Sequence, residues 1–197
     1  IQRAIQKNTL LIRNSVKKSV LDEYQSITKS DRFRGVGPVT LQIINMTADI
    51  QEDIPNIRNS YNVTDKADGL RAMGIVTTSG ELFLIDQSMN VYRTGLQNKK
   101  CSQSIVDGEW VTFTKDGKAI NHYLIFDIYY SINSTPSYQL PFATFKDGSI
   151  DMNEPSRFNL MNQWYSLWND NPQVIAKGIT ESNRLIIALK HFSFASP

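Results

Sequence analysis

The part of the chain that most limits its fold is the stretch from Tyr61 to Tyr130. Short segments rich in β-branched and aromatic residues alternate there with tight-turn residues. This pattern is typical of strands joined by turns, and it predicts a mostly antiparallel sheet. The expected strands are Asn62 to Ala67, Arg71 to Thr77, Leu82 to Asp86, Val91 to Thr94, Ser104 to Thr114 and Ala119 to Tyr130.

Helical spacing of apolar residues marks two further segments. From Ile1 to about Tyr24 this spacing predicts one long amphipathic helix. Between Glu154 and Asn169 aromatic residues recur every three to four positions after Pro155, so we expect a helix packed on the sheet, with its tryptophans in the core. The fold class expected is therefore α+β, with mostly antiparallel sheets and packed helices.

The remaining segments divide the chain. Residues 28–38 are polar, basic and glycine-bearing, which is typical of a connector. Strand-like patterns follow at Val39 to Ile44 and near the end at Arg184 to Phe194. We expect an N-terminal helix and connector over residues 1–35 and a main domain over residues 36–197.

Composition narrows the class of protein. With 197 residues, 41% of them hydrophobic, the chain can bury a sizeable core as one domain or a domain with an appendage. A net charge of only +2 means that any nucleic-acid contact must come from local clusters. One cysteine and two separated histidines exclude an internal disulfide and a structural zinc pattern, and no apolar run is long enough to span a bilayer. We expect a cytoplasmic protein with no membrane partner.

The run Lys66 to Arg71, with sequence KADGLR, brings a lysine, an acid, a glycine and an arginine together between two expected strands. An amine whose pKa is lowered by nearby cations can attack the α-phosphorus of a nucleoside triphosphate and hold the nucleotide as a phosphoramidate. The ordinary alternative is a turn, because Asp-Gly tolerates positive φ. Asp-Gly also begins at positions 107, 116 and 147, and the pair at 116 fits a hairpin corner between Lys115 and Lys118.

Two later segments, each considered alone, also fit either a nucleotide-binding role or an ordinary structural role. Gly108 lies inside an expected strand, where glycine often marks a close approach by a ligand or backbone, and Glu109 beside it suits ribose hydroxyls. The ordinary interpretation of Glu109 is a solvated side chain on an edge strand. In the strand Tyr123 to Ile128, alternation places Phe126 on the face of Ile128 and opposite Asp127. Its ring is suited to stack on a purine, or is simply buried.

Taken in order, these three pieces resemble the covalent nucleotidyltransferase superfamily of mRNA capping enzymes and polynucleotide ligases. The Lys-x-Asp-Gly motif with its arginine, the Asp-Gly-Glu motif and the aromatic-Asp strand are all matched, by residues 66–71, 107–109 and 126–127. Together with the segment Leu82 to Tyr92, the match looks most like the guanylyltransferase domain of capping enzymes from large DNA viruses. The resemblance covers about residues 36 to 194.

This resemblance implies a mechanism. Lys66 attacks GTP to give a covalent enzyme-GMP intermediate, and GMP then passes to the diphosphate 5′ end of nascent RNA, with Mg²⁺ or Mn²⁺ as the cofactor. The implied nucleotide-binding residues are Asp68, Gly69, Arg71, Glu109, Phe126 and Lys190. Triphosphatase and methyltransferase domains on the same polypeptide are implied as partners.

The chain also departs from the family pattern. Gln87 stands where related capping enzymes often place an arginine that meets the triphosphate, and Arg93 is a nearby substitute. The later acidic-Gly and Lys-x-Lys strands and an oligonucleotide-binding domain do not follow residue 130. We expect an excised piece, truncated before those motifs and starting at Ile1 rather than at a methionine.

Alternative functions remain open. An ATP-dependent DNA or RNA ligase forms the same kind of lysine adduct with AMP, and an inactive structural or interaction fragment is a second alternative. The basic positions of the first helix, Lys7, Arg13, Lys17 and Lys18, suit either RNA or a neighbouring domain, or form a solvated face.

Overall fold

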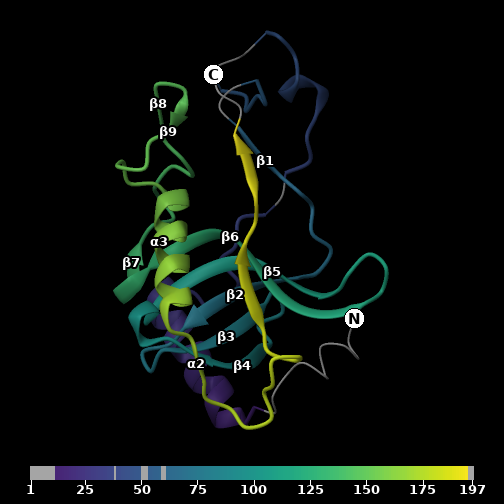
Figure 1. The fold of residues 1–197 in the computed structure, drawn as a ribbon. Coiled ribbons are helices and arrows are strands. Elements are labelled where there is room, and N and C mark those ends of the chain that lie inside the picture. Colours follow the sequence, from purple (N-terminus) through teal and green to yellow (C-terminus); the bar gives the residue numbers. More distant parts are fainter. Residues whose placement is uncertain (1–11, 38, 50–52, 59–60, 195–197) are drawn as a thin grey trace.

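A mostly antiparallel sheet forms the centre of the molecule (Figure 1). The computed structural model describes residues 12–37, 39–49, 53–58 and 61–194. In these residues the sheet has eight strands in the order β10-β4-β3-β2-β5-β6-β11, with β7 paired to β6, and only β11 runs parallel to its neighbour. The strands are β2 (Leu70–Val76), β3 (Glu81–Asp86), β4 (Val91–Gln97), β5 (Ser104–Phe113), β6 (Ala119–Ser131), β7 (Thr135–Pro136), β10 (Gln173–Val174) and β11 (Ile186–Leu189).

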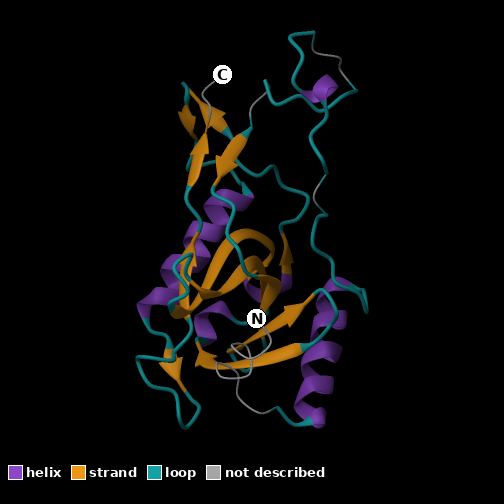
Figure 2. Cartoon of the chain, turned by 90° about the vertical axis from the view of Figure 1, so that its right-hand side faces the viewer, coloured by secondary structure: helices purple, strands orange, loops and turns teal. Residues whose placement is uncertain are grey.

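Smaller elements surround this sheet. Strands β1 (Asn62–Thr64) and β12 (Phe192–Phe194) form an antiparallel pair, and β8 (Phe145–Lys146) and β9 (Ser149–Ile150) form another. In the described part of the chain, two α-helices, α2 (Asn14–Thr28) and α3 (Arg157–Asp170), lie on two sides of the strands, as Figure 2 shows. Three short 3₁₀ helices are η1 (Ile43–Asn45), η2 (Lys99–Cys101) and η3 (Ile132–Ser134).

Alternation along the central strands separates two cores. In β3, Leu82 and Leu84 join the cluster that packs under α3, whereas Phe83 and Ile85 join the cluster that contains Val20 of α2. Successive side chains of a strand point to opposite faces, so the five strands β2 to β6 contribute residues to both cores. No helix in the described part of the chain is long and apolar enough to cross a membrane.

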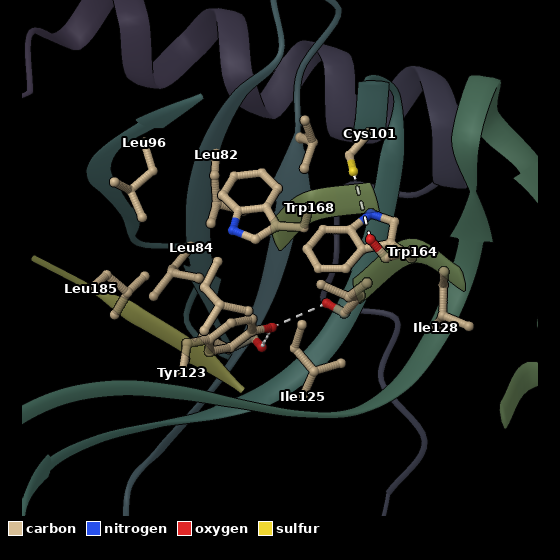
Figure 3. Close-up of a cluster of buried hydrophobic side chains, with 14 of the residues drawn as sticks. Leu82, Leu84, Leu96, Cys101, Tyr123, Ile125, Ile128, Trp164, Trp168 and Leu185 are labelled. Carbon is tan, nitrogen blue, oxygen red and sulfur yellow. Dashed lines mark hydrogen bonds between the residues drawn. The ribbon is translucent and has the colours of Figure 1, made fainter. Parts of the chain in front are cut away.

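The core under α3 is built around aromatic side chains (Figure 3). The rings of Trp164 and Trp168 stack with centroids 5.3 Å apart, and both side chains are buried, as expected for the core. Beside them the fully buried Tyr123 hydroxyl donates to the carbonyl of Ala72 (2.8 Å) and accepts from the N–H of Gly74 (2.9 Å). This side chain thus ties β6 to β2 across the intervening strand β5.

The predicted strands between residues 70 and 131 are confirmed, with bounds shifted by one to three residues. The hairpin corner at Lys115 to Lys118 is also confirmed. Thr114 donates its N–H to the carbonyl of Lys118 (2.9 Å), and Gly117 takes a positive φ of 81°. The first expected strand is shorter than predicted, because β1 ends at Thr64 and residues 65–69 form a loop.

The N-terminal helix differs from the prediction. Residues 1–11 lie outside the described residues, and Arg13 is extended, so the described helix begins at Asn14. It continues past Tyr24 to Thr28, because both side chains are buried and the Thr28 hydroxyl donates to the carbonyl of Tyr24 (2.9 Å). Lys29 then ends the helix in the left-handed conformation.

Two strand predictions were wrong. The segment Val39 to Ile44 has no strand partner among the described residues, and its side chains at Val39 and Ile43 are 92% and 79% exposed. The segment Arg184 to Phe194 is interrupted at Lys190 and His191, so that β11 pairs with β6 whereas β12 pairs with β1. The predicted helix at Glu154 to Asn169 is confirmed, although it begins later, at Arg157.

Candidate active site

Lys66 lies in the loop that joins β1 to β2 and faces solvent. Its Nζ is 2.9 Å from Asp68 Oδ1, and the two side chains are 86% and 95% exposed. The hydrogen bond to Asp68 raises the pKa of Lys66, and the same contact lowers the pKa of Asp68. An ion pair this exposed is weak and exchanges readily with water or a ligand.

The second half of this loop is fastened to β5. The N–H of Gly69 donates to Glu109 Oε1 (2.8 Å), and Leu70 pairs with Trp110 in the sheet. A Cβ at position 69 would lie 2.5 Å from the carbonyl oxygen of Trp110. Only glycine therefore fits where the lysine loop meets β5.

Arg71 is held by a buried network rather than left free. Its guanidinium binds both carboxylate oxygens of Asp107, at 3.2 Å and 2.6 Å, and donates to the carbonyl of Val36 (2.7 Å). Tyr129 donates its hydroxyl to the same carboxylate (3.0 Å). Burial raises the pKa of Asp107, while the hydrogen bond from Arg71 opposes that shift and favours the carboxylate. The network fixes the guanidinium in place.

Two cations lie near the ring of Phe126. The guanidinium carbon of Arg71 and the Nζ of Lys190 are each 5.6 Å from the centre of its ring. The ring of Phe33, from the connector, lies at the same distance from Arg71. Lys190 reaches this position because its N–H donates to the carbonyl of Ile125 (2.8 Å) beyond the end of β11.

Two adjoining pockets contain the expected nucleophile and the expected nucleotide-binding residues apart from Arg71, which lines neither of them. The lysine pocket, of about 990 Å³, is lined by Lys66, Asp68 and Gly69 among others. The phenylalanine pocket, of about 560 Å³, is lined by Glu109 and Phe126 among others. Thr64 and Lys190 line both pockets, so the structure brings the expected nucleophile and the expected base-stacking ring to one continuous surface.

The surroundings of Gly108, Glu109 and Phe126 differ from those expected from the sequence. A Cβ at Gly108 would lie 2.6 Å from the ring of Tyr123 and 2.8 Å from the backbone oxygen of Leu124, so the protein itself, rather than a ligand, makes the close approach. Glu109 belongs to β5, which lies between β2 and β6, so it is not on an edge strand. Ile128 lies in the core under α3 rather than beside Phe126, because the pairing of β5 with β6 shifts register between Asp107 and Gly108.

Arg93 and Gln87 lie apart from these pockets. Arg93, in β4, pairs with Glu81 through Nε and Oε1 (2.6 Å) and lines neither pocket. Gln87 follows β3 in the turn organised by Asp86, whose carboxylate accepts from the N–H groups of Ser88 and Asn90 at 2.9 Å. The structure does not bring either side chain to Lys66.

Sequence reasoning missed Arg157, which lines the phenylalanine pocket. Its Nε donates to Asp127 Oδ1 (2.8 Å), and the buried carboxylate ties the start of α3 to β6. Burial raises the pKa of Asp127, and the contact with Arg157 opposes this. The aromatic-Asp motif gave Asp127, but nothing local to residue 157 signals its partner.

The carboxylates suit a metal held mainly by substrate phosphates. Among the described residues no group of three or more His, Cys, Asp or Glu side chains could hold a metal ion. Asp65 and Asp68 nevertheless line the lysine pocket, and Mg²⁺ is usually bound by one or two carboxylates together with phosphates. The exposed oxygens of Asp68 therefore fit Mg²⁺ or Mn²⁺ arriving with a nucleotide.

Comparison with known protein families assigns the chain to one of them. A model of the mRNA capping enzyme catalytic domain matches residues 3–189. The chain therefore belongs to the mRNA capping enzyme catalytic-domain family, and the antiparallel sheet with its two helices is compatible with that family. The match supports nucleotidyl transfer of the mRNA capping type. A search among curated proteins found no match.

Proposed function

We propose that this domain is an mRNA guanylyltransferase in which Lys66 is the nucleophile. The observation that carries the proposal is the continuity of the lysine pocket with the phenylalanine pocket through Thr64 and Lys190. A guanine on Phe126 would then leave its phosphates directed toward Lys66. Family membership supports the same class of reaction.

The reaction has two steps. The neutral Nζ of Lys66 attacks the α-phosphorus of GTP, an N–P bond forms, and the bond to the β-phosphate oxygen breaks to release pyrophosphate. A terminal phosphate oxygen of the RNA 5′-diphosphate then attacks the same phosphorus. The N–P bond breaks, Lys66 recovers a proton, and the product carries a 5′-to-5′ guanosine linkage.

Nearby residues bind and orient the nucleotide in this proposal. Phe126 stacks on guanine, since a base on an aromatic ring contributes about 1–3 kcal/mol. Arg71 uses three of its five N–H donors within the protein, which leaves two for the ribose. Glu109 uses Oε1 for Gly69, and Oε2 accepts from a ribose hydroxyl. Lys190, above the same ring, contacts the base.

Lys66 must lose a proton before it attacks. Because Asp68 raises the pKa of the amine, the contact between them opposes the reaction and must open when the nucleotide binds. Asp68 would then hold Mg²⁺ or Mn²⁺, which supplies positive charge that offsets the polyphosphate and helps pyrophosphate leave. Asp68 thus keeps Lys66 protonated until the nucleotide binds, and it then serves as a ligand of the metal ion.

The test uses the intact protein, α-labelled GTP and a divalent metal, followed by denaturing electrophoresis. Label should appear on the unmodified protein and be absent from Lys66→Ala. Lys66→Arg should also lack label while it still binds GTP, because arginine keeps the charge but stays protonated. Lys146→Ala, a change at an exposed lysine in β8, is the matched control and should label normally. If Lys66→Ala still takes up label, the assignment of Lys66 as the nucleophile is wrong.

The same assay separates the alternatives. A ligase of the adenylating kind would take label from ATP in preference to GTP. An inactive relic would take label from neither. We expect GTP to be preferred, and an origin in a large DNA virus is part of this proposal.

A further inference from the structure

A third cavity lies beside the end of β6, where the connector after α2 crosses the sheet. It has a volume of about 340 Å³, and its walls include three tyrosines and two arginines but no aspartate or glutamate. The polar lining residues are Thr28, Arg34, Tyr129, Tyr130, Tyr138 and Arg157. We name it the tyrosine cavity.

Two rings of this cavity pack against each other, and one of them leaves aromatic surface open to solvent. The centroids of Tyr130 and Tyr138 are 5.6 Å apart with the rings tilted by 52°. Tyr138 is 48% exposed, although its N–H is fixed to the carbonyl of Tyr129. Neither the Tyr130 nor the Tyr138 hydroxyl has a hydrogen-bond partner within the part of the chain that the structure describes. The cavity therefore offers aromatic surface and free hydroxyl groups.

Two arginines give the cavity a positive charge, and one of them, Arg34, has no charged partner among the described residues. Arg34 is exposed, and its guanidinium has no ion pair or hydrogen bond with any other described residue. Its backbone is nevertheless held, because its N–H donates to the Tyr24 hydroxyl (3.0 Å). A cation presented on a fixed backbone beside aromatic rings is the combination that binds single-stranded nucleic acid.

The tyrosine cavity adjoins the nucleotide site. Arg157 lines both this cavity and the phenylalanine pocket. Val36 and Tyr129, on the opposite wall, are hydrogen-bonded to Arg71 and Asp107, so the two sites share one buried network. A strand lying in the cavity would have its end close to Phe126 and the transferred nucleotide.

We propose that the tyrosine cavity binds the 5′-terminal nucleotides of the single-stranded RNA that accepts GMP. In this inference, which rests on the proposed function, the exposed ring of Tyr138, supported by Tyr130, stacks on a base and Arg34 binds a backbone phosphate. The absence of acidic side chains from the lining favours a polyanion over an acceptor of neutral or basic character.

The test measures binding of a fluorescent single-stranded oligoribonucleotide with a 5′-diphosphate to the intact protein. Tyr138→Ala should weaken binding about 5- to 150-fold, as expected for the loss of one stacked base, whereas Tyr138→Phe keeps the ring and should stay within about 3-fold. Arg34→Ala should also reduce the slope of log affinity against log salt by about 0.7. Arg34→Glu, which reverses the charge, should weaken binding further than Arg34→Ala. Its control is Arg184→Glu, at an exposed arginine that lines none of the three pockets, and this change should affect affinity much less.

A second readout separates this inference from the proposed function. Formation of the Lys66 adduct uses no RNA, so every variant here should label with GTP like the unmodified protein. Variants that label normally and bind RNA like the unmodified protein would overturn the inference and leave the guanylyltransferase intact. Loss of RNA binding in the variants of a protein that never labels would support the cavity and reject the guanylyltransferase. Absence of RNA binding by the unmodified protein, or an equal loss in Arg184→Glu, would also overturn the inference.

Discussion

Glu109 accepts a 2.8 Å hydrogen bond from the backbone N–H of Gly69, and this contact fixes the loop that carries Lys66 against β5. The loop is otherwise exposed, with Lys66 and Asp68 paired only to each other. The position of the proposed nucleophile therefore depends on a glycine three residues further along the chain. It depends equally on the carboxylate of Glu109, which lies 40 residues after Gly69 in the sequence.

Gly69→Ala should destabilise the protein and abolish GMP labelling. The added Cβ would lie 2.5 Å from the Trp110 carbonyl oxygen and 2.8 Å from Glu109 Cγ, so the loop must move away from β5. Overpacking of this kind typically costs about 1–3 kcal/mol in the free energy of unfolding. Denaturant unfolding measures the cost, and Gly37→Ala is the control, since a Cβ at Gly37 meets nothing within 4 Å. Equal stability and labelling in the two variants would contradict this account.

Asp107→Ala should lower the free energy of unfolding by more than a substitution at an exposed residue does. Asp107 is fully buried and pairs with Arg71, which is 19% exposed, so its removal leaves a largely buried guanidinium without its carboxylate. Breaking a buried pair in this way costs about 3–5 kcal/mol. The control is Asp170→Ala at the exposed pair with Lys100, which should change the unfolding midpoint little. Similar losses in both variants would show that the Arg71 network is not structural.

The Cys101 thiol should resist alkylation in the folded protein. Burial raises its pKa to about 12, so almost none of it is thiolate at pH 8. We expect iodoacetamide to react slowly with the native protein and rapidly once denaturant exposes the side chain under Trp164. Mass spectrometry of the cysteine peptide over time measures both rates. Fast alkylation without denaturant would contradict the buried position of the Cys101 side chain.

The rate of GMP adduct formation should rise with pH and depend on Asp68. The neutral amine is the nucleophile, and Asp68 raises the pKa of Lys66, so at neutral pH most of the amine is protonated. Asp68→Asn keeps a turn-forming residue but removes the opposite charge, which lowers the pKa of Lys66 again. The rise in labelling rate should therefore move to lower pH in this variant. A profile that stays in place, or moves to higher pH, would exclude Asp68 as the group that holds the proton on Lys66.

Local sequence pattern predicted most of the central sheet but not its long-range pairings. Alternation and turn residues suffice for β2 to β6, because antiparallel neighbours joined by tight turns form locally. Alternation at Val39 to Ile44 was misleading, since a strand also needs a partner and the described residues supply none. Lys190 reaches Phe126 only because β11 pairs in parallel with β6, which no local pattern specifies.

In the candidate site, too, the sequence motifs predicted some features, whereas others depend on long-range contacts. Motif order singled out Lys66, Glu109 and Phe126, and the structure places these three residues in two adjoining pockets; their roles stay a prediction. It did not indicate that Arg71 would be engaged by a buried carboxylate, or that Arg157 from α3 would reach the site. Both features depend on contacts between segments more than 25 residues apart.

The most direct test of the central claim is to locate the nucleotide on the protein. After incubation with GTP and Mg²⁺, proteolysis and mass spectrometry under conditions that preserve the N–P bond should find one GMP on the peptide that contains Lys66. The same peptide should be unmodified after incubation without GTP. GMP on any other residue, or AMP in place of GMP when both nucleotides are supplied, would contradict the assignment of Lys66 as the nucleophile of a guanylyltransferase.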